Sequence, residues 1–153
     1  MPRRPLLRLL PFAATLLAVS ACSDPVEVDA VTPQSGTATI CGELRESLPA
    51  VVADQSLRKV SPAKAASAWG DPAIVLQCGV RKPAALTATS QCFAVSGVDW
   101  LAEKSAKRLV FTTIGREAYV RVTVPAEYDP GSDALSDLAE SIKESVPSVR
   151  ACL

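Results

Sequence analysis

The sequence contains no histidine among its 153 residues. Histidine is the usual general base near neutral pH and a common metal ligand, so its absence excludes Ser-His-Asp and Cys-His catalysis and His-ligated metal sites. Aromatic residues are scarce, and 16 basic side chains balance 16 acidic ones. A chain with no excess of positive charge lacks the electrostatic signature of a nucleic-acid-binding protein, and we expect no such partner. The remaining composition, 48% hydrophobic and 21% charged, is typical of one globular domain.

The N-terminus has the organisation of an export signal. Three arginines within the first eight residues precede an apolar run over residues 9–19. This run is shorter than the ~20 residues that a membrane-spanning helix needs, which favours a cleaved signal peptide over residues 1–21. The following Val-Ser-Ala-Cys, ending at Cys22, is similar to the bacterial lipobox, in which the cysteine thiol receives a diacylglyceryl group before cleavage.

A lipid on Cys22 would hold the mature chain at the outer face of the cytoplasmic membrane. Loss of residues 1–21 removes three arginines and no acidic residue, leaving 13 basic against 16 acidic side chains. The mature chain is therefore mildly acidic, and its membrane attachment should depend on acyl chains. Residues 22–40 show no apolar periodicity, and we expect them to form a flexible tether.

Four further cysteines, an even number in an exported chain, predict two disulfides within a single domain over residues 41–153. Three pairings are possible. We favour Cys78 with Cys92, which bracket a turn-like stretch, and Cys41 with Cys152, which lie at the two ends of regular structure. A site of four thiolates is the alternative, but the chain has no Cys-x-x-Cys pair, and we expect no metal and no cofactor.

The hydrophobic pattern predicts an α+β domain, a two-layer sandwich of about four mostly antiparallel strands with helices packed on one face. The expected strands cover residues 73–78, 92–95, 108–114 and 118–124, of which the first two pair and the last two form a hairpin. The expected helices cover residues 43–52 and 133–146, the second capped by Ser132 and ended by Pro147. Ser61-Pro62 resembles a helix start, and the alternative is a strand over residues 66–69.

Four stretches carry a family resemblance. They are AWGDPAIVLQCGVRKPAAL from Ala68, VSGVDWL from Val95, FTTIGREAYVRVTVP from Phe111, and Cys-Gly-x-Leu-x-x-x-Leu-Pro from Cys41. Together they resemble an actinobacterial lipoprotein family known as domain of unknown function 3515, across almost the whole mature domain. The resemblance implies an envelope lipoprotein. It supplies no catalytic residues, because no biochemical activity is established for the family.

Three groups of polar residues could support chemistry, and each has a simpler explanation. Ser61 and Lys64 match the Ser-x-x-Lys of penicillin-recognising enzymes, but the Ser-Asp-Asn and Lys-Thr-Gly elements are absent and a helix cap explains the serine. An acidic group lacks EF-hand spacing and suits a solvated helix face, and a basic group lacks interleaved aromatics and suits a solvated edge. The acidic group is Asp129, Asp133, Asp137, Glu140 and Glu144, and the basic group is Arg81, Lys82, Lys104, Lys107 and Arg108.

Both tryptophans lie beside acidic turns, Trp69 before Asp71 and Trp100 after Asp99. Such pairs can line a sugar or peptide groove, where the ring stacks and the carboxylate accepts hydrogen bonds. Arg116 and Tyr119 would add contacts. The alternative is that both indoles are core anchors.

These features predict a cell-envelope lipoprotein that acts as a non-catalytic binding or interaction module. Its expected partners are the membrane, through the lipid anchor, and an envelope protein or cell-wall ligand. The alternative is a hydrolase or transferase acting on cell-wall material, with Ser61 as nucleophile and Lys64 as base.

Overall fold

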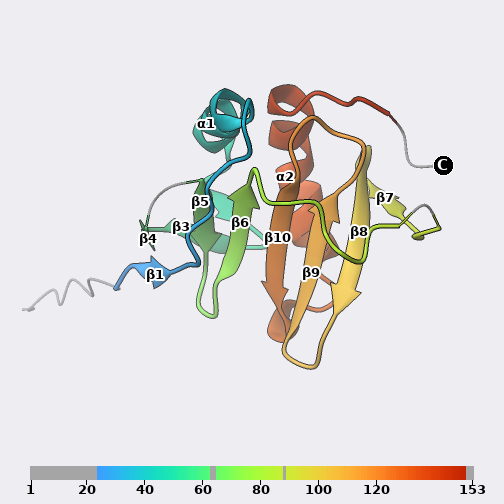
Figure 1. The fold of residues 1–153 in the computed structure, drawn as a ribbon. Coiled ribbons are helices and arrows are strands. Elements are labelled where there is room, and N and C mark those ends of the chain that lie inside the picture. Colours follow the sequence, from blue (N-terminus) through green and yellow to red (C-terminus); the bar gives the residue numbers. More distant parts are fainter. Residues whose placement is uncertain (1–23, 63–64, 88, 151–153) are drawn as a thin grey trace, which may run out of the picture.

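The computed structural model describes residues 24–62, 65–87 and 89–150. Within them the chain forms one eight-stranded antiparallel sheet, one two-stranded parallel sheet and two α-helices (Figure 1). The helices are α1 (Ala38–Ser47) and α2 (Ser132–Ser145), and a short 3-10 turn, η1 (Ala126–Tyr128), precedes α2. The parallel sheet pairs β1 (Val26–Glu27) with β4 (Val60–Ser61).

The large sheet has the strand order β2-β3-β5-β6-β10-β9-β8-β7. In that order the strands are Val51–Val52, Gln55–Arg58, Ala66–Trp69, Ile74–Cys78, Val120–Pro125, Arg108–Thr113, Val98–Lys104 and Phe93–Val95. Every neighbouring pair in this sheet is antiparallel.

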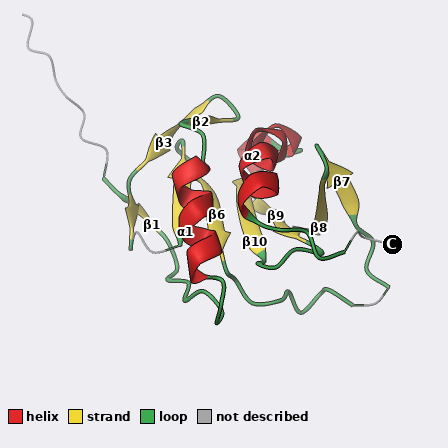
Figure 2. Cartoon of the chain, turned by 90° about the horizontal axis from the view of Figure 1, so that it is seen from above, coloured by secondary structure: helices red, strands yellow, loops and turns green. Residues whose placement is uncertain are grey.

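The sheet curves around helix α2. The helix contacts β2 at one edge of the sheet and both β7 and β8 at the other, which a flat sheet of eight strands would not permit. Figure 2 shows the strands arranged in an arc with both helices on its concave side. The concave side therefore holds the core, and the convex side is left for the N-terminal segment, the loop after β6 and solvent.

The core forms because side chains alternate along the strands. Val120, Val122 and Val124 of β10 are fully buried, whereas Arg121 and Thr123 between them are half-buried on the convex side. On α2 the buried residues recur at helical spacing and pack against the sheet and α1. They are Ala134, Leu135, Leu138, Ala139, Ser141 and Ile142.

This mostly β architecture shows that the predicted four-strand α+β sandwich is wrong. The sheet has eight strands. Strand β2 was not expected because its two valines were assigned to the helix over residues 43–52, and strand β3 was not expected because it is short and mostly polar. Strand β8 was also missed, since its Asp-Trp and Glu-Lys pairs resemble turn sequence. Residues 93–95 are a strand, but they pair with β8 rather than with residues 73–78.

Several local predictions are confirmed. Strand β6 lies where residues 73–78 were expected to be a strand, β9 and β10 form the expected hairpin, and α2 follows the expected helical period. The strand alternative for residues 66–69 is also confirmed as β5. The hairpin strands and α2 carry an apolar period long enough to determine their structure locally, whereas β5 and β6 are short, mostly buried runs.

Two helix predictions need correction. Helix α1 begins at Ala38 and ends at Ser47, before Pro49, instead of covering residues 43–52. Ser61 lies in strand β4, so Ser61-Pro62 does not begin a helix.

The residue preceding α2 is Gly131, and Ser132 does not cap the helix with its side chain. Gly131 has a φ of 78°, a conformation that glycine adopts at little cost. A Cβ at this position would also lie 3.0 Å from the Phe111 ring. The start of α2 thus depends on a turn glycine packed on strand β9 rather than on a serine cap.

The described part of the expected tether, residues 24–40, lies against the domain. Strand β1 pairs with β4, the Asp29 carbonyl oxygen accepts a hydrogen bond from Gln77 Nε2 at 2.9 Å, and Gln34 N donates to the Gly79 carbonyl at 3.3 Å. Helix α1 also begins at Ala38, before residue 41. This segment therefore forms part of the convex surface and leads into α1 (Figure 1).

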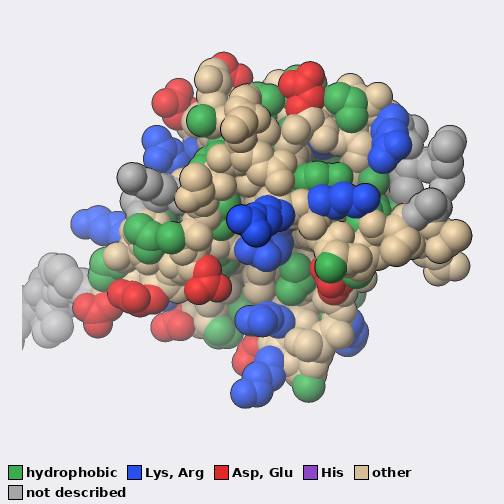
Figure 3. Space-filling view, in the orientation of Figure 1, with side chains coloured by type: hydrophobic (Ala, Val, Ile, Leu, Met, Phe, Trp, Pro, Cys, Tyr) green, Lys and Arg blue, Asp and Glu red, His purple; other side chains and the backbone are tan. Residues whose placement is uncertain are grey.

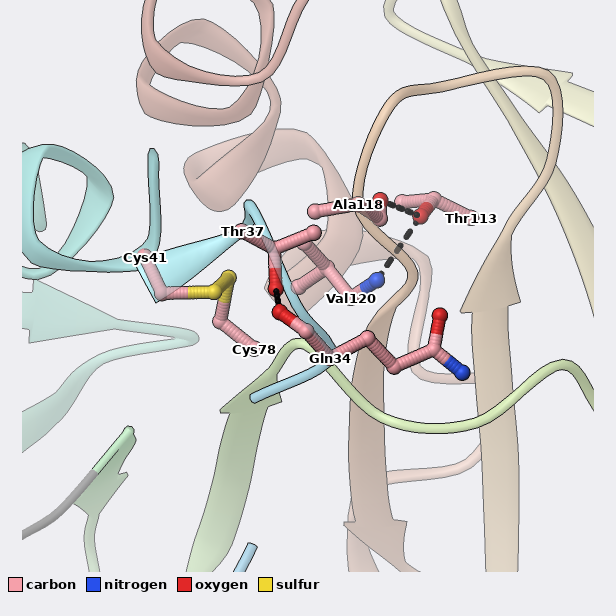
Figure 4. The surroundings of a disulfide bond; sticks show 7 residues. All are labelled: Gln34, Thr37, Cys41, Cys78, Thr113, Ala118 and Val120. Atoms are coloured by element: carbon pink, nitrogen blue, oxygen red, sulfur yellow. Dashed lines mark hydrogen bonds between the residues drawn. A yellow bond between two sulfur atoms is a disulfide. The ribbon is translucent and has the colours of Figure 1, made fainter. Parts of the chain in front are cut away.

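The disulfide pairing differs from the favoured one. Cys41 of α1 is bonded to Cys78 at the end of β6, with 5.5 Å between the Cα atoms (Figure 4). The pairings Cys41–Cys152 and Cys78–Cys92 are therefore wrong. Cys92 is also disulfide-bonded, while Cys22 and Cys152 lie outside the described residues.

Candidate functional site

The two tryptophans do not form a groove. Both indoles are 0% exposed, and Trp69 Nε1 donates a 2.9 Å hydrogen bond to the Pro49 carbonyl. Three strands separate β5 from β8 in the sheet, so the two tryptophans do not lie on neighbouring strands. The indoles are core anchors, so the predicted Trp-Asp groove is wrong.

The two aspartates of the predicted groove also lie on different elements. Asp71 is exposed in the turn after β5 and lies 3.8 Å from Arg58. Asp99 lies on β8 and interacts electrostatically with Arg116. Tyr119 is half-buried, and its carbonyl oxygen accepts hydrogen bonds from Gly79 N and Val80 N. Of the six predicted groove residues, the structure joins Asp99 with Trp100 and Arg116 at one end of β8 and leaves Trp69, Asp71 and Tyr119 elsewhere.

Arg116 has a structural role at the end of α2. Its Nη1 donates to the carbonyl oxygens of Val146 at 2.5 Å and Ile142 at 3.4 Å, where the negative end of the helix dipole lies. Burial lowers the pKa of this guanidinium below its usual value, and the Asp99 carboxylate opposes that shift. The predicted ligand contact is instead a C-terminal helix cap.

The described residues do not form the Ser-x-x-Lys arrangement that was considered for catalysis. Ser61 is exposed in strand β4, so the helical turn that would bring a Ser-x-x-Lys pair together is missing there. Lys64 lies outside the described residues.

The acidic group occupies exposed positions on and before α2. Asp129, Asp133 and Asp137 line a cavity of about 440 Å³ beside the start of α2. Asp137 accepts a 2.8 Å hydrogen bond from Ala53 N, and Asp129 pairs with Lys104 at 3.0 Å. Among the residues that the structure describes, no group of three or more acidic or cysteine side chains could hold a metal ion.

A second cavity of about 610 Å³ lies on the convex side of the sheet, and we call it the basic groove. One wall is the N-terminal segment, the other is the loop after β6, and the floor comes from strands β8, β9 and β10. Its lining is Ala30, Val31, Thr32, Gly79, Val80, Arg81, Lys82, Pro83, Ala84, Glu103, Val110, Thr112 and Arg121. Lys and Arg side chains lie along the middle of this face in Figure 3, and acidic ones gather near β1.

Sheet register places the floor residues on one side. Arg121 of β10 is paired with Thr112 of β9, and Val110 of β9 is paired with Glu103 of β8. Paired residues point to the same face of a sheet, and residues two apart on one strand also share a face. The four floor residues therefore form a compact block on the convex surface.

Arg121 is held in place by Gln77. The Gln77 Oε1 accepts hydrogen bonds from Arg121 Nη2 at 2.8 Å and Nε at 3.2 Å. The Gln77 amide in turn donates to the Asp29 carbonyl oxygen. Gln77 is only 5% exposed, so it links the guanidinium on the floor to the wall formed by the N-terminal segment.

The walls are joined near the disulfide. A Cβ on Gly79 would lie 2.8 Å from Pro33, and Gly79 has a φ of 75°. Glycine therefore allows the two walls to approach closely at this point. Cys78 directly precedes Gly79, so the Cys41–Cys78 bond ties α1 and the segment before it to the start of the loop.

The basic groove has the chemistry of an anion site. Arg81, Lys82 and Arg121 contribute three positive charges, and Glu103 contributes one negative charge. The backbone N–H groups of Gly79 and Val80 already bond to Tyr119, so recognition of an anion would depend on side chains. Arginine and lysine bind carboxylates and phosphates through charge-assisted hydrogen bonds.

Sequence reasoning named two of the three cations of this groove but interpreted them as part of a solvated edge. Arg81 and Lys82 belong to that basic group, whereas Lys104 pairs with Asp129, and Lys107 and Arg108 lie at the turn between β8 and β9. Arg121 and Gln77 were not predicted as site residues. The available signal was that Gln77 and Arg121 are polar residues in two otherwise apolar strands. This signal does not identify a site unless the pairing register of the two strands is known.

The described residues form a small, mostly β protein with a positively charged groove on the convex side of its sheet. Residues 5–151 match the family model described as Protein of unknown function (DUF3515), and the chain belongs to that family. Searches of curated proteins and of solved structures gave no match. Neither helix in the described residues is long and apolar enough to cross a membrane.

Proposed function

We propose that this chain is a lipoprotein anchored through Cys22 at the outer face of the cytoplasmic membrane and that its domain binds an anionic ligand of the cell envelope without chemical turnover. The basic groove carries the binding part of this proposal. Arg81, Lys82 and Arg121 all line this cavity, and strands β8, β9 and β10 supply its floor. The Val-Ser-Ala-Cys sequence supports the anchoring part.

The size and position of the groove favour a ligand over a simple charged surface. About 610 Å³ lies within the usual range for small-molecule sites. Arg121 is fixed by Gln77 before any ligand arrives, which reduces the entropy that binding must overcome. The exposed Ser61 in a strand gives no support to the alternative of a cell-wall hydrolase or transferase.

Binding can be tested with inorganic phosphate as the probe. The full chain carrying Cys22→Ala, labelled with ¹⁵N, would be titrated while amide shifts are recorded. We expect saturable shifts at residues 79–84 and at Arg121, and at least a fivefold loss of affinity in Arg121→Gln, because one fixed cation is removed.

Arg108→Gln is the matched control. Arg108 is an exposed arginine at the start of β9 and is outside the groove lining. It should bind phosphate with nearly the original affinity. Equal losses in both variants would mean that phosphate responds only to total charge, and the groove would then not be a site.

A further inference from the structure

The lining of the basic groove restricts the class of anion that it can hold. None of the lining residues is aromatic. Sugar rings and nucleobases are commonly held by stacking on aromatic side chains, so the groove lacks the usual means of holding either. The two tryptophans that could have served are buried in the core.

The charged part of the groove suits a group with two negative charges. Three cations and one carboxylate leave a net charge of +2 around the floor. Arg121 has five N–H donors, of which Gln77 accepts from two nitrogens, so further donors remain for a ligand. A guanidinium matches phosphate oxygens in a bidentate arrangement, and Lys82 adds a mobile point charge.

The apolar part of the groove lies beside these cations. Val31 comes from the N-terminal wall, Pro83 from the loop wall and Val110 from the floor, and all three are half-buried. Half-buried apolar side chains gain free energy when an aliphatic group covers them. A ligand that satisfied only the cations would leave this side of the groove in water.

We infer that the basic groove binds an aliphatic phosphate ester, with the phosphate held by Arg81, Lys82 and Arg121 and the hydrocarbon lying against Val31, Pro83 and Val110. The inference rests on the proposed function, because it specifies the ligand class of the same site. Phosphate esters of this kind occur as membrane lipids and as free metabolites, and both present the same chemistry to the groove.

The position of the groove makes the membrane a reachable source. Ala30 in the wall is eight residues after Cys22, and an extended chain of that length spans at most about 29 Å. A lipid on Cys22 would therefore hold the groove within this distance of the bilayer surface.

The test uses a series of probes with the full chain carrying Cys22→Ala, followed by amide shifts and by calorimetry. The soluble probes are inorganic phosphate, hexyl phosphate and hexanoate. We expect hexyl phosphate to bind about tenfold more tightly than inorganic phosphate, because its methylene groups cover the apolar wall, and more tightly than hexanoate. Val110→Ser should remove most of the advantage of hexyl phosphate and leave inorganic phosphate nearly unchanged.

The outcomes separate the two proposals. If inorganic phosphate and hexyl phosphate bind with equal affinity, the aliphatic assignment is overturned and the anion site remains. If hexanoate binds more tightly than hexyl phosphate, the ligand is a carboxylate instead. Failure of all three probes to shift residues 79–84 would overturn both proposals. The Lys82→Gln variant should weaken both phosphates, and Lys107→Gln, which removes an exposed lysine outside the lining, should weaken neither.

A final arm distinguishes the two sources of the ester. Vesicles of a neutral phospholipid would be compared with vesicles containing phosphatidic acid. If the protein sediments with phosphatidic acid vesicles and hexyl phosphate prevents this sedimentation, a bilayer lipid is an accessible ligand. Tight binding of hexyl phosphate with no sedimentation assigns the site to free phosphate esters.

Discussion

At the scale of single residues, the candidate site depends on how Gln77 is paired. Its side-chain oxygen faces Arg121 and its amide nitrogen faces the Asp29 carbonyl, so one buried amide joins the floor and the wall of the groove. Buried amides that satisfy both ends of their hydrogen-bonding capacity restrict the orientation of their neighbours. Gln77 is thus a positioning residue, and Arg121 is the residue that would touch a ligand.

Replacement of Gln77 by Leu tests this role. Gln77→Leu should lower the affinity for inorganic phosphate about threefold to tenfold, because Arg121 loses its fixed orientation, and should cost roughly 1 kcal/mol of stability. Affinity would be measured by amide-shift titration and stability by urea unfolding. In the Arg121→Gln background the same change should have no further effect on affinity. An additive loss would show that Gln77 acts only through general destabilisation.

The tryptophans show why a pattern of neighbouring residues led to the wrong prediction of a groove. Trp69 and Trp100 each have an aspartate close by in the sequence, a pattern that also occurs in open binding grooves. Sheet pairing aligns Trp69 with Ile74 and Trp100 with Thr113, and all four side chains are buried on the concave side. Which face a strand residue occupies is decided by its cross-strand partners and not by its neighbours in the chain.

At the scale of elements, local periodicity was sufficient for some segments and not for others. The β9–β10 hairpin and α2 have long apolar repeats, so the sequence predicts them well. Strands β2 and β3 have two and four residues and exist because they extend the edge of a sheet that curves around α2. Their sequences contain little of the information that determines them, since the pairing is long-range.

The disulfide error has the same origin. The favoured pairing placed Cys41 at the start of the domain and next to the other end of the chain. Helix α1 begins earlier than expected and packs at the end of β6, which brings Cys41 within bonding distance of Cys78. The disulfide connectivity depends on where α1 packs, and the spacing of cysteines in the sequence does not reveal that position.

The Cys41–Cys78 bond should stabilise the domain and the groove together. It closes a loop of 37 residues, for which the chain-entropy model gives about 4 kcal/mol. We expect the Cys41→Ala/Cys78→Ala variant to lose a free energy of unfolding of this order in urea. Its phosphate affinity should also fall, because the bond ties the N-terminal wall to the start of the loop.

Peptide mapping under non-reducing conditions checks the connectivity itself. It should recover a peptide that joins Cys41 to Cys78, and recovery of Cys78 joined to Cys92 would contradict the structure. The same map identifies the partner of Cys92, for which Cys22 and Cys152 are the remaining cysteines. A lipid on Cys22 would leave Cys152 as the partner.

At the scale of the whole molecule, acidic side chains predominate on α2 and basic ones in the groove. The exposed positions of α2 carry Asp133, Asp137, Glu140 and Glu144 beside Lys143, whereas Arg81, Lys82 and Arg121 line the groove on the convex side of the sheet. Figure 3 shows the basic side chains of that convex face. The net charge of the proposed mature chain is slightly negative, so overall attraction to an anionic membrane is not expected, and the orientation of the molecule would depend on this division.

Attachment to the membrane should therefore depend on the lipid at Cys22. In wild-type cells we expect the protein in the membrane fraction, with an N-terminal peptide that begins at Cys22 and carries the mass of a diacylglyceryl group. Cys22→Ala should abolish that modification and release the protein from membranes after a high-salt wash, which removes weak electrostatic contacts with lipid phosphates. Ser23→Ala, which leaves the Val-Ser-Ala-Cys sequence intact, is the matched control and should remain bound. Retention of Cys22→Ala through the wash would show that an element other than the Cys22 lipid holds the chain at the membrane.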